Sequence, residues 1–476
     1  MHPPSAMPRS LPRILRSALL LAAALPGVAA GLAAQSPTRT RAQLLATLDS
    51  IAGAPVTRGE TAGLAVVVLH GRDTLLARGY GRADVARGDS MTVGHVFPIA
   101  SLTKQLAAAA VLRLVEQGTV GLDDPITRHL PDAPVQGRRV TIRQLLTHTS
   151  GLPDFADRPD PDSTYGREVR PTTTLARVRG LPFDFAPGTE LRYSNTGYLL
   201  LGMLLERHTG VPFAEHVTRT LLRPAGATSA GYCGGRSGAT APVPGYRWHR
   251  DELRAVQPLH PSVAHAAGGT HLCASALDLA AWNAALHHGR TLRPASYAEM
   301  TRGAVVRGPS GDSLRARYGF GVALSELAGR RAVHHGGDEA GYASYLAHLP
   351  DDALSVVVLL NTEGPVRHVA LVEQLVEAAL GSAPAAPARP DGPTRAALVR
   401  LTGRYGDGPA AFTLTGDRLA FVWQGGPPEP MRWTGGQTFA NGPSRFSFIT
   451  RPGAPPAVWA DLTYVVARWT RSTPTP

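Results

Sequence analysis

Lysine is almost absent from this chain. Lys104 is the only one, so the other 47 of its 48 lysines and arginines are arginines. A GC-rich genome replaces lysine with arginine wherever only positive charge is needed, so one surviving lysine can be a matter of chance. However, a desolvated ammonium group can lose its proton, whereas a guanidinium keeps it. The pattern therefore favours a site at Lys104 that needs a neutral amine.

Long apolar runs are scarce as well, and the one candidate lies at the N-terminus. Residues 1–34 combine three arginines with an apolar run from Ala18 to Leu25 and with small residues at two cleavage positions, after Ala30 or after Ala34. This arrangement predicts an export signal. The run is too short for a permanent membrane anchor, which is the weaker alternative. We expect a mature protein that is periplasmic or extracellular.

Cysteine is limited to Cys233 and Cys273. In an exported protein the two can form a disulfide, and two buried free thiols are the alternative. No cysteine lies near the predicted cleavage position, which excludes lipid attachment there.

Several motifs of other protein classes are missing. There is no His-Glu-x-x-His zinc motif and no Gly-x-Ser-x-Gly nucleophile elbow, so we expect no metal, no cofactor and no α/β-hydrolase site. The net charge of +12 comes from scattered arginines, which excludes nucleic acid as a favoured partner. An anionic cell envelope is a candidate partner, and a solvated arginine-rich surface is the alternative.

The hydrophobic pattern predicts strands at both ends of the first 380 residues and helices between them. Strands are expected at 63–69, 74–81, 342–350 and 353–361, and helices at 101–118, 140–153, 196–207, 212–222, 275–288 and 365–380. Such an order predicts an α/β (α+β) fold: an antiparallel sheet flanked by terminal helices, with an inserted and mostly helical lobe. A catalytic cleft is expected where the sheet meets the lobe.

The composition divides the chain further. The catalytic unit is predicted to span 35–380, and a Pro/Ala linker follows at 381–393. Short apolar pieces separated by Gly and Pro then predict a small all-β domain, a barrel or sandwich, at 394–476.

Three short motifs carry candidate chemistry. Ser101 and Lys104 stand one helical turn apart, so a neutral lysine could accept the proton of the serine hydroxyl. Tyr193 and Asn195 precede a predicted helix, where a phenol can act as acid or base and an amide can orient a partner. Residues 335–337 read His-Gly-Gly, and two glycines let a substrate approach the backbone closely.

Taken in order, these motifs resemble those of the serine β-lactamase and penicillin-binding protein superfamily, and in particular the class C β-lactamase-related hydrolases. The segments LLTHTSGLP at 145–153 and HGGDEAGYAS at 335–344 are similar to stretches of that family. The resemblance covers about 40–380 and implies a β-lactamase/transpeptidase-like fold.

The resemblance also implies roles for individual residues. Ser101 would be the acylated nucleophile, and Lys104 and Tyr193 would share its proton transfers. Asn195 would orient substrate or lysine. The opposite wall would be His335, Gly336 and Gly337, and the oxyanion hole would use the backbone N–H groups of Ser101 and Asp338.

One departure from the family affects the expected substrate. Many β-lactamases have lysine at the position of His335, and a histidine is mostly neutral at pH 7. We therefore expect a secreted serine hydrolase acting as an esterase or as a peptidase on D-amino-acid substrates. The alternatives are a genuine β-lactamase and a penicillin-binding sensor that is acylated without turnover. The substrate is an ester, an amide, a D-peptide or a β-lactam, and the oligomeric state stays open.

Overall fold

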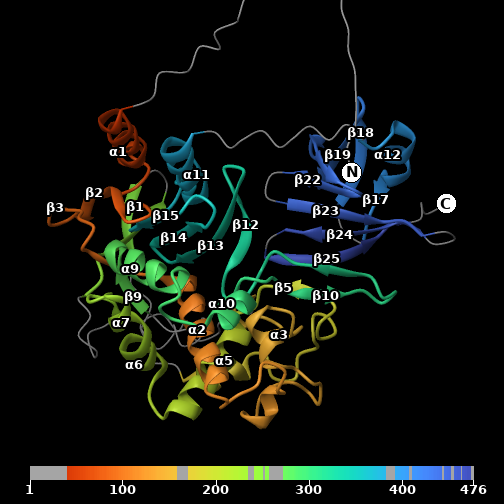
Figure 1. Ribbon diagram of the computed structural model, residues 1–476, viewed down its shortest axis with the longest axis horizontal. Coiled ribbons are helices and arrows are strands. Elements are labelled where there is room, and N and C mark those ends of the chain that lie inside the picture. The colour runs from red at the N-terminus through yellow and green to blue at the C-terminus, as the bar shows by residue number, and fades with distance from the viewer. Residues whose placement is uncertain are drawn as a thin grey trace, which may run out of the picture. The chain divides into compact units, whose positions relative to one another are not determined.

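The sheet at the centre of the first 380 residues contains strands from both ends of that segment (Figure 1). Its seven antiparallel strands run in the order β12-β13-β14-β15-β1-β2-β3. Their bounds are β1 Gly63–His70, β2 Asp73–Asp84, β3 Asp89–Ser90, β12 Ala323–Leu327, β13 Arg330–Glu339, β14 Tyr342–Leu349 and β15 Leu354–Leu360. Both predicted hairpins are present, and Val67 of β1 pairs with Val357 of β15 where the two ends meet.

The computed structural model describes residues 40–157, 170–233, 241–249, 252–256, 272–381, 392–406, 410–441, 444–451, 455–462 and 464–472. The expected export signal and most of the predicted linker lie outside these residues. In the described part of the chain, no helix has both the length and the apolar character needed to cross a bilayer.

Helices cover both faces of the central sheet. On one face, α1 (Arg41–Thr57) packs against α11 (His368–Leu380), and their side chains bury one face of β1. On the other face, α9 (Ala276–His287) packs against β1 and β15. Because both faces are covered, the first six residues of β1 are all buried, as expected of a central strand that reads as a continuous apolar run.

The inserted lobe is mostly helical, as predicted. Its remaining helices are α2 Thr103–Glu116, α3 Ile142–Leu146, α4 Pro171–Ala176, α5 Asn195–Thr209, α6 Phe213–Val217, α7 Arg223–Ala225 and α10 Pro294–Met300, with short turns η1 Ala100–Leu102, η2 Ile126–Arg128 and η3 Phe155–Asp157. Its short strands, with β16 beside them, are β4 Val96–Pro98, β6 Gly231–Tyr232, β7 Gly245–His249, β8 Glu252–Val256, β9 Leu272–Ser275, β10 Val305–Arg307, β11 Ser313–Arg315 and β16 Thr362–Glu363.

The helix predicted at 212–222 is divided. After α6 the chain forms a π-helical turn at Thr218–Leu222 and then continues as α7. Pro224 has no N–H to donate to the carbonyl of Thr220 in a regular helix. That carbonyl instead accepts a hydrogen bond of 2.8 Å from Nη1 of Arg113 in α2.

The C-terminal region forms two antiparallel sheets behind a short helix, α12 Arg395–Leu401. The four-stranded sheet contains β17 Gly403–Arg404, β18 Ala410–Thr415, β19 Arg418–Trp423 and β20 Glu429–Pro430. The second contains β21 Arg432–Gly435, β22 Thr438–Asn441, β23 Ser444–Ile449, β24 Ala457–Asp461 and β25 Val465–Thr470. Aromatic side chains from both sheets, among them Phe412 and Phe446, share one buried core.

The second C-terminal sheet does not end at β25. Its sixth strand is β5 (Leu191–Arg192), which comes from the lobe and immediately precedes Tyr193. Leu191 pairs with Val466, and Arg192 pairs with Val465. The C-terminal region is therefore joined by backbone pairing to a segment that carries a candidate catalytic residue (Figure 1).

Candidate active site

The candidate nucleophile lies in the turn between β4 and α2. Ser101 is the middle residue of η1, and Ala100 before it has φ of +46°, a left-handed conformation that is costly for a residue with a Cβ. Lys104 follows in the first turn of α2 and is fully buried. Its Nζ lies 3.2 Å from Oγ of Ser101, so the local spacing brings the amine to the hydroxyl.

An amide and a carboxylate hold the other side of the lysine. Nζ of Lys104 also lies 2.9 Å from Oδ1 of Asn195, the first residue of α5. Asn195 in turn donates from both its backbone N and its Nδ2 to one oxygen of Asp154, at 3.0 and 2.9 Å. This double contact fixes the amide so that its oxygen faces the lysine. Asp154 was not among the residues predicted from the sequence.

Burial dominates the electrostatics of Lys104. Desolvation lowers the pKa of its ammonium group from 10.5 to about 7, while the negative charge of Asp154 opposes the change. The Nζ atom also lies 4.8 Å from the centre of the Tyr193 ring. A substantial fraction of this amine is therefore neutral at pH 7, the form that can accept a proton from a serine hydroxyl.

Tyr193 lies between β5 and α5 with its side chain directed at the nucleophile. Burial raises the pKa of its phenol well above the usual value, and a hydrogen bond with the Ser101 side chain partly opposes this. Tyr193 is therefore a protonated phenol at neutral pH, which is the form that can donate a proton to a departing group.

The His-Gly-Gly segment lies on β13, beside η1. His335 is buried on the face of the sheet that carries Ser101, and His334 points to the opposite face, as the alternation of a strand requires. A Cβ built on Gly337 would lie 3.0 Å from the backbone N of Ser101. The absence of a side chain at this position is what allows strand and nucleophile to approach.

The ring of His335 is held neutral. Its Nε2 lies 2.9 Å from the hydroxyl of Tyr318, a residue that was not predicted. Burial lowers the pKa of His335 to about 3, and the charges of Lys104 and His334 act in the same direction. At neutral pH this position therefore carries no positive charge, unlike the lysine of many β-lactamases.

A second unpredicted aromatic residue comes from the C-terminal region. The backbone N of Tyr193 donates to the carbonyl of Tyr464 at 3.0 Å. The ring of Tyr464 lies 5.6 Å from the rings of both Tyr193 and His335, and 5.8 Å from that of Tyr318. Burial raises its pKa to about 12, opposed by a hydrogen bond with the backbone of Gly336.

His148, within the segment LLTHTSGLP, supports the tyrosines. Its Nδ1 accepts a hydrogen bond of 3.1 Å from the backbone N of Ser194, and its ring lies 4.3 Å from that of Tyr193. Burial and the charges of Lys104 and His335 lower its pKa well below the usual value, so this ring is also neutral. The quoted segment was the signal for His148, whereas nothing local marked Tyr318 or Tyr464.

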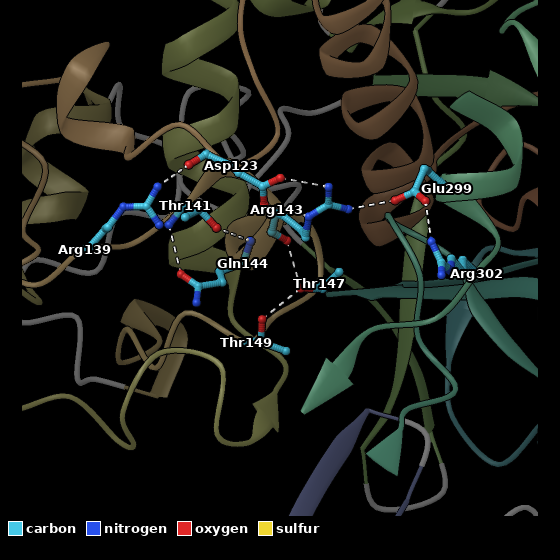
Figure 2. A network of polar contacts seen from close by, with 9 residues as sticks. All are labelled: Asp123, Arg139, Thr141, Arg143, Gln144, Thr147, Thr149, Glu299 and Arg302. Atoms are coloured by element: carbon cyan, nitrogen blue, oxygen red, sulfur yellow. Dashed lines mark hydrogen bonds and ion pairs between the residues drawn. The ribbon is translucent and has the colours of Figure 1, made fainter. Parts of the chain in front are cut away.

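A polar network fixes the segment that carries His148 (Figure 2). Thr141 and Gln144 form a reciprocal capping box at the start of α3. Arg143 of the same helix bridges Asp123, at 2.9 Å, and Glu299, at 2.7 Å. The helix that precedes His148 is therefore tied both to the lobe and to α10.

The two cysteines lie behind the nucleophile. Cys233 and Cys273 form a disulfide, with their Cα atoms 5.2 Å apart. Cys273 of β9 pairs with Pro98 of β4, and the backbone N of Ile99 donates to the carbonyl of Leu272 at 3.0 Å. The disulfide therefore supports the strand that leads into Ser101.

Asp338 follows Gly337 on β13, and its side chain is exposed. By strand alternation that side chain points away from the face of His335, so only the backbone of Asp338 can take part in an oxyanion hole. Residues 335–339 lie beyond the last pair of β12 with β13, Ala323 with His334. This part of the β13 edge is therefore not paired with β12.

Known proteins share both the sequence pattern and the fold. A family model described as Beta-lactamase matches residues 48–380. The D-aminopeptidase of Brucella canis is 27% identical over an alignment of 414 positions, which covers 79% of this chain and 74% of that protein. The D-amino acid amidase from Ochrobactrum anthropi SV3, in a crystal structure with L-phenylalanine, is 25% identical, with a TM-score of 0.61 over 71% of this chain and 98% of the amidase.

One solved structure extends over the C-terminal region as well. The octameric penicillin-binding protein homologue from Pyrococcus abyssi is 22% identical and has a TM-score of 0.61. The match covers 89% of this chain and 100% of the homologue, and it concerns the fold alone.

Proposed function

The chain belongs to the Beta-lactamase family and is a serine hydrolase, and from this premise we propose that it is exported and cleaves amides and short peptides of D-amino acids through an acyl-enzyme on Ser101. The D-aminopeptidase and D-amino acid amidase relatives support the substrate class.

The neutral ring of His335 is the feature that favours some substrates over others. Penicillins and peptides ending in D-alanine present a carboxylate near the reacting carbonyl, and a buried neutral histidine gives that anion no charged partner. Within the described residues, no arginine is among the groups whose charges shift the pKa of His335. Amides without that carboxylate fit such a site better.

A negative charge near the site favours a substrate with a free amino group. Asp154 lies behind Asn195, whose side-chain oxygen contacts Lys104. Its carboxylate gives this part of the site a negative potential, which attracts the ammonium group of an amino-acid amide.

The residues can carry acylation without a cofactor. Neutral Lys104 takes the proton of Ser101, and Oγ attacks the substrate carbonyl carbon to form a tetrahedral intermediate. The N–H groups of Ser101 and Asp338 are the proposed donors to its oxyanion. A hydrogen bond with the backbone of Gly336 lowers the pKa of Tyr464, which supports placing the Gly336 backbone at the edge of β13 that is not paired with β12. Backbone N–H groups two residues apart on a strand point to the same edge. The N–H of Asp338 is therefore proposed to face that edge too.

Breakdown of the intermediate needs an acid. The phenol of Tyr193 gives a proton to the departing nitrogen, the C–N bond breaks, and Tyr193 regains its proton from the Lys104 ammonium. A water molecule then attacks the ester on Ser101 while the Lys104 and Tyr193 pair accepts its proton. The serine oxygen leaves with a proton, and the D-amino acid is released.

An esterase is a second candidate, because a neutral His335 accepts an uncharged ester as readily as an amide. The deciding experiment is a substrate panel for the purified protein, with Ser101→Ala as the control. It compares D- and L-phenylalanine amide, a p-nitrophenyl ester and nitrocefin, and it measures acylation of Ser101 by intact-protein mass spectrometry.

We expect the D-amide to be hydrolysed at least tenfold faster than the L-amide and than nitrocefin. Hydrolysis of esters alone would select the esterase. Fast hydrolysis of nitrocefin would select a β-lactamase, and a stable adduct without product would select the sensor. Export is tested separately by sequencing the mature N-terminus, which we expect at Gln35.

A further inference from the structure

Tyr464 enters the active site from the connection between β24 and β25. Its carbonyl accepts from the backbone N of Tyr193, and its ring borders both Tyr193 and His335. Its ring lies 5.6 Å from that of His335, on the part of β13 that is not paired with β12, and a hydrogen bond with the backbone of Gly336 lowers the pKa of its phenol. A residue far along the chain therefore occupies the edge along which an extended substrate would lie.

The chemistry identifies which end of the cleft this is. The departing nitrogen must take its proton from Tyr193, so the leaving group has to lie beside that phenol while the bond breaks. The acyl group remains attached to Ser101 on the other side of the carbonyl. The space next to Tyr193 and His335 is thus the leaving-group side, and Tyr464 forms its boundary.

The connection that carries Tyr464 is held in place on both sides. Arg317 makes a two-pronged ion pair with Asp461, with Nε 3.0 Å from Oδ2 and Nη2 3.3 Å from Oδ1, and both side chains are nearly buried. After Tyr464, Val465 pairs with Arg192 of β5. Arg468 of β25 contacts Asp312 at 2.8 Å.

Such anchoring makes Tyr464 a fixed wall. The Asp461 carboxylate is buried against Arg317 at the end of β24, and β25 is hydrogen-bonded to β5 directly before Tyr193. Movement of the backbone that carries Tyr464 away from the cleft would require breaking a buried ion pair or a strand pairing, both of which are costly.

We propose that Tyr464 is a specificity-determining residue that closes the leaving-group end of the cleft, so that the enzyme releases ammonia or one small amine and rejects longer leaving groups. This inference rests on the proposed acyl-enzyme at Ser101. It narrows the substrate class to D-amino-acid amides and the shortest peptide amides.

The test varies only the leaving group. D-Phenylalanyl compounds with ammonia, methylamine, glycine amide and glycylglycine amide as leaving groups are offered to the full chain, and kcat and KM are measured separately by product chromatography. The variants are Tyr464→Ala, which removes the ring, and Tyr464→Phe, which removes only the hydroxyl. Val465→Ala is the matched control, because Val465 is the next described residue and is 37% exposed.

In the wild type we expect kcat/KM to fall at least tenfold from ammonia to glycylglycine amide. Tyr464→Ala should remove most of this fall, mainly by lowering KM for the longer compounds, while Tyr464→Phe and Val465→Ala keep it. Equal changes for all leaving groups, or no fall in the wild type, would overturn the inference. A change in preference among D-alanine, D-leucine and D-phenylalanine amides instead would place Tyr464 on the acyl side and also overturn it.

Two further measurements separate this inference from the proposed function. Labelling of Ser101 by a fluorophosphonate tests the nucleophile without any amide, and methyl, ethyl and hexyl esters of D-phenylalanine repeat the size series if the wild type cleaves no amide. If the thermal melting curve shows that Tyr464→Ala is unfolded, Tyr464→Leu replaces it. If the wild type is labelled at Ser101 but the variants show the same dependence on leaving-group size as the wild type, Ser101 remains the nucleophile. The proposed role of Tyr464 is then wrong.

Discussion

Gly337 lies so close to Ser101 that a Cβ on the glycine would be 3.0 Å from the backbone N of the serine. The same atom would also lie 2.6 Å from the carbonyl O of Ile99, and neither backbone group can move without moving the nucleophile. Gly336 is different, because a Cβ there would meet the Tyr345 ring at 3.4 Å, which is an ordinary contact. The two glycines of the motif thus have different physical roles.

This difference predicts opposite outcomes for two alanine substitutions. Gly337→Ala should displace η1 from β13, lowering kcat/KM at least about 100-fold and the free energy of unfolding by about 1–3 kcal/mol. Gly336→Ala should have a free energy of unfolding within about 1 kcal/mol of that of the wild type. Chemical denaturation and acylation rates measure both, and equal stability of the two variants would contradict the contact.

Tyr193→Phe should affect amides far more than activated esters. Because its raised pKa keeps Tyr193 protonated, loss of the hydroxyl removes the acid that an amine leaving group needs. We expect hydrolysis of D-phenylalanine amide to fall by about 10²–10³-fold, and that of a p-nitrophenyl ester by less than about tenfold, since p-nitrophenolate leaves unprotonated. Steady-state rates on the two substrates are compared. Equal losses would assign Tyr193 a structural task.

The pH profile should report Lys104. Since neutral amine is the reactive form and burial lowers its pKa to about 7, kcat/KM should rise with pH through a midpoint near 7. The charge of Asp154 raises that pKa, so Asp154→Asn should move the midpoint to lower pH while its weaker hold on Asn195 lowers the plateau. Rates of Ser101 acylation from pH 5 to 9 test this. A midpoint that stays in place or moves upward would rule out Lys104 as the base.

Burying this lysine should cost stability. The unfolded chain keeps Lys104 protonated up to pH 10.5 and the folded protein only to about 7, so stability rises with pH between these values. The difference corresponds to about 5 kcal/mol at pH 7, and the lost contacts with Ser101 and Asn195 offset part of it. Lys104→Met should thus be inactive yet more stable by about 2 kcal/mol at pH 7.

Denaturation of the wild type and Lys104→Met at pH 6.5, 8 and 9.5 tests that estimate. The difference between their free energies of unfolding should become smaller as the pH rises. Lys104→Arg is the control, because it buries a permanent charge and should be both inactive and less stable. A gap that stays constant with pH would show that the amine is not desolvated.

The sequence was sufficient for the parts of the molecule that depend on local spacing. Both hairpins of the central sheet, the helices at 196–207 and 275–288 and the approach of Lys104 to Ser101 follow from periods of two and 3.6 residues, and the predicted family and α+β fold are confirmed. The export signal and the linker stay predictions. The π-helical turn before Pro224 was missed, because the Thr220 carbonyl that the proline leaves without a helical partner is satisfied by Arg113 of another helix.

Three site residues could not be predicted for the same reason. Tyr318 and Tyr464 stand in segments without a motif, and Asp154 comes directly after the segment LLTHTSGLP. Each reaches the site only through tertiary packing. Tyr464 in particular lies in a piece that reads as an ordinary strand of a separate domain. Its place depends on the pairing of β5 with β25 and on the Arg317–Asp461 ion pair, neither of which has a local signature.

A histidine pair away from the active site should make the fold sensitive to acid. His287 of α9 stacks on His348 of β14 with ring centres 4.2 Å apart, and Nδ1 of His348 lies 3.1 Å from Oγ of Ser355. Burial lowers the pKa of His348 to about 4, and the positive charges of His288 and Arg331 add to this. The folded protein therefore resists protonation that the unfolded chain accepts below pH 6.5.

Stability should accordingly be lost as the pH falls from 6.5 to 4, by about 3 kcal/mol for His348 alone. His348→Gln keeps a polar partner for Ser355 and should flatten this loss, at the cost of about 1 kcal/mol at pH 8 from the lost stacking. His70→Gln, at the exposed end of β1, is the control and should leave the slope unchanged. Denaturation at pH 8, 6, 5 and 4 measures the slopes. If His348→Gln and the wild type lose stability in parallel, the buried pair is not the acid-sensitive element.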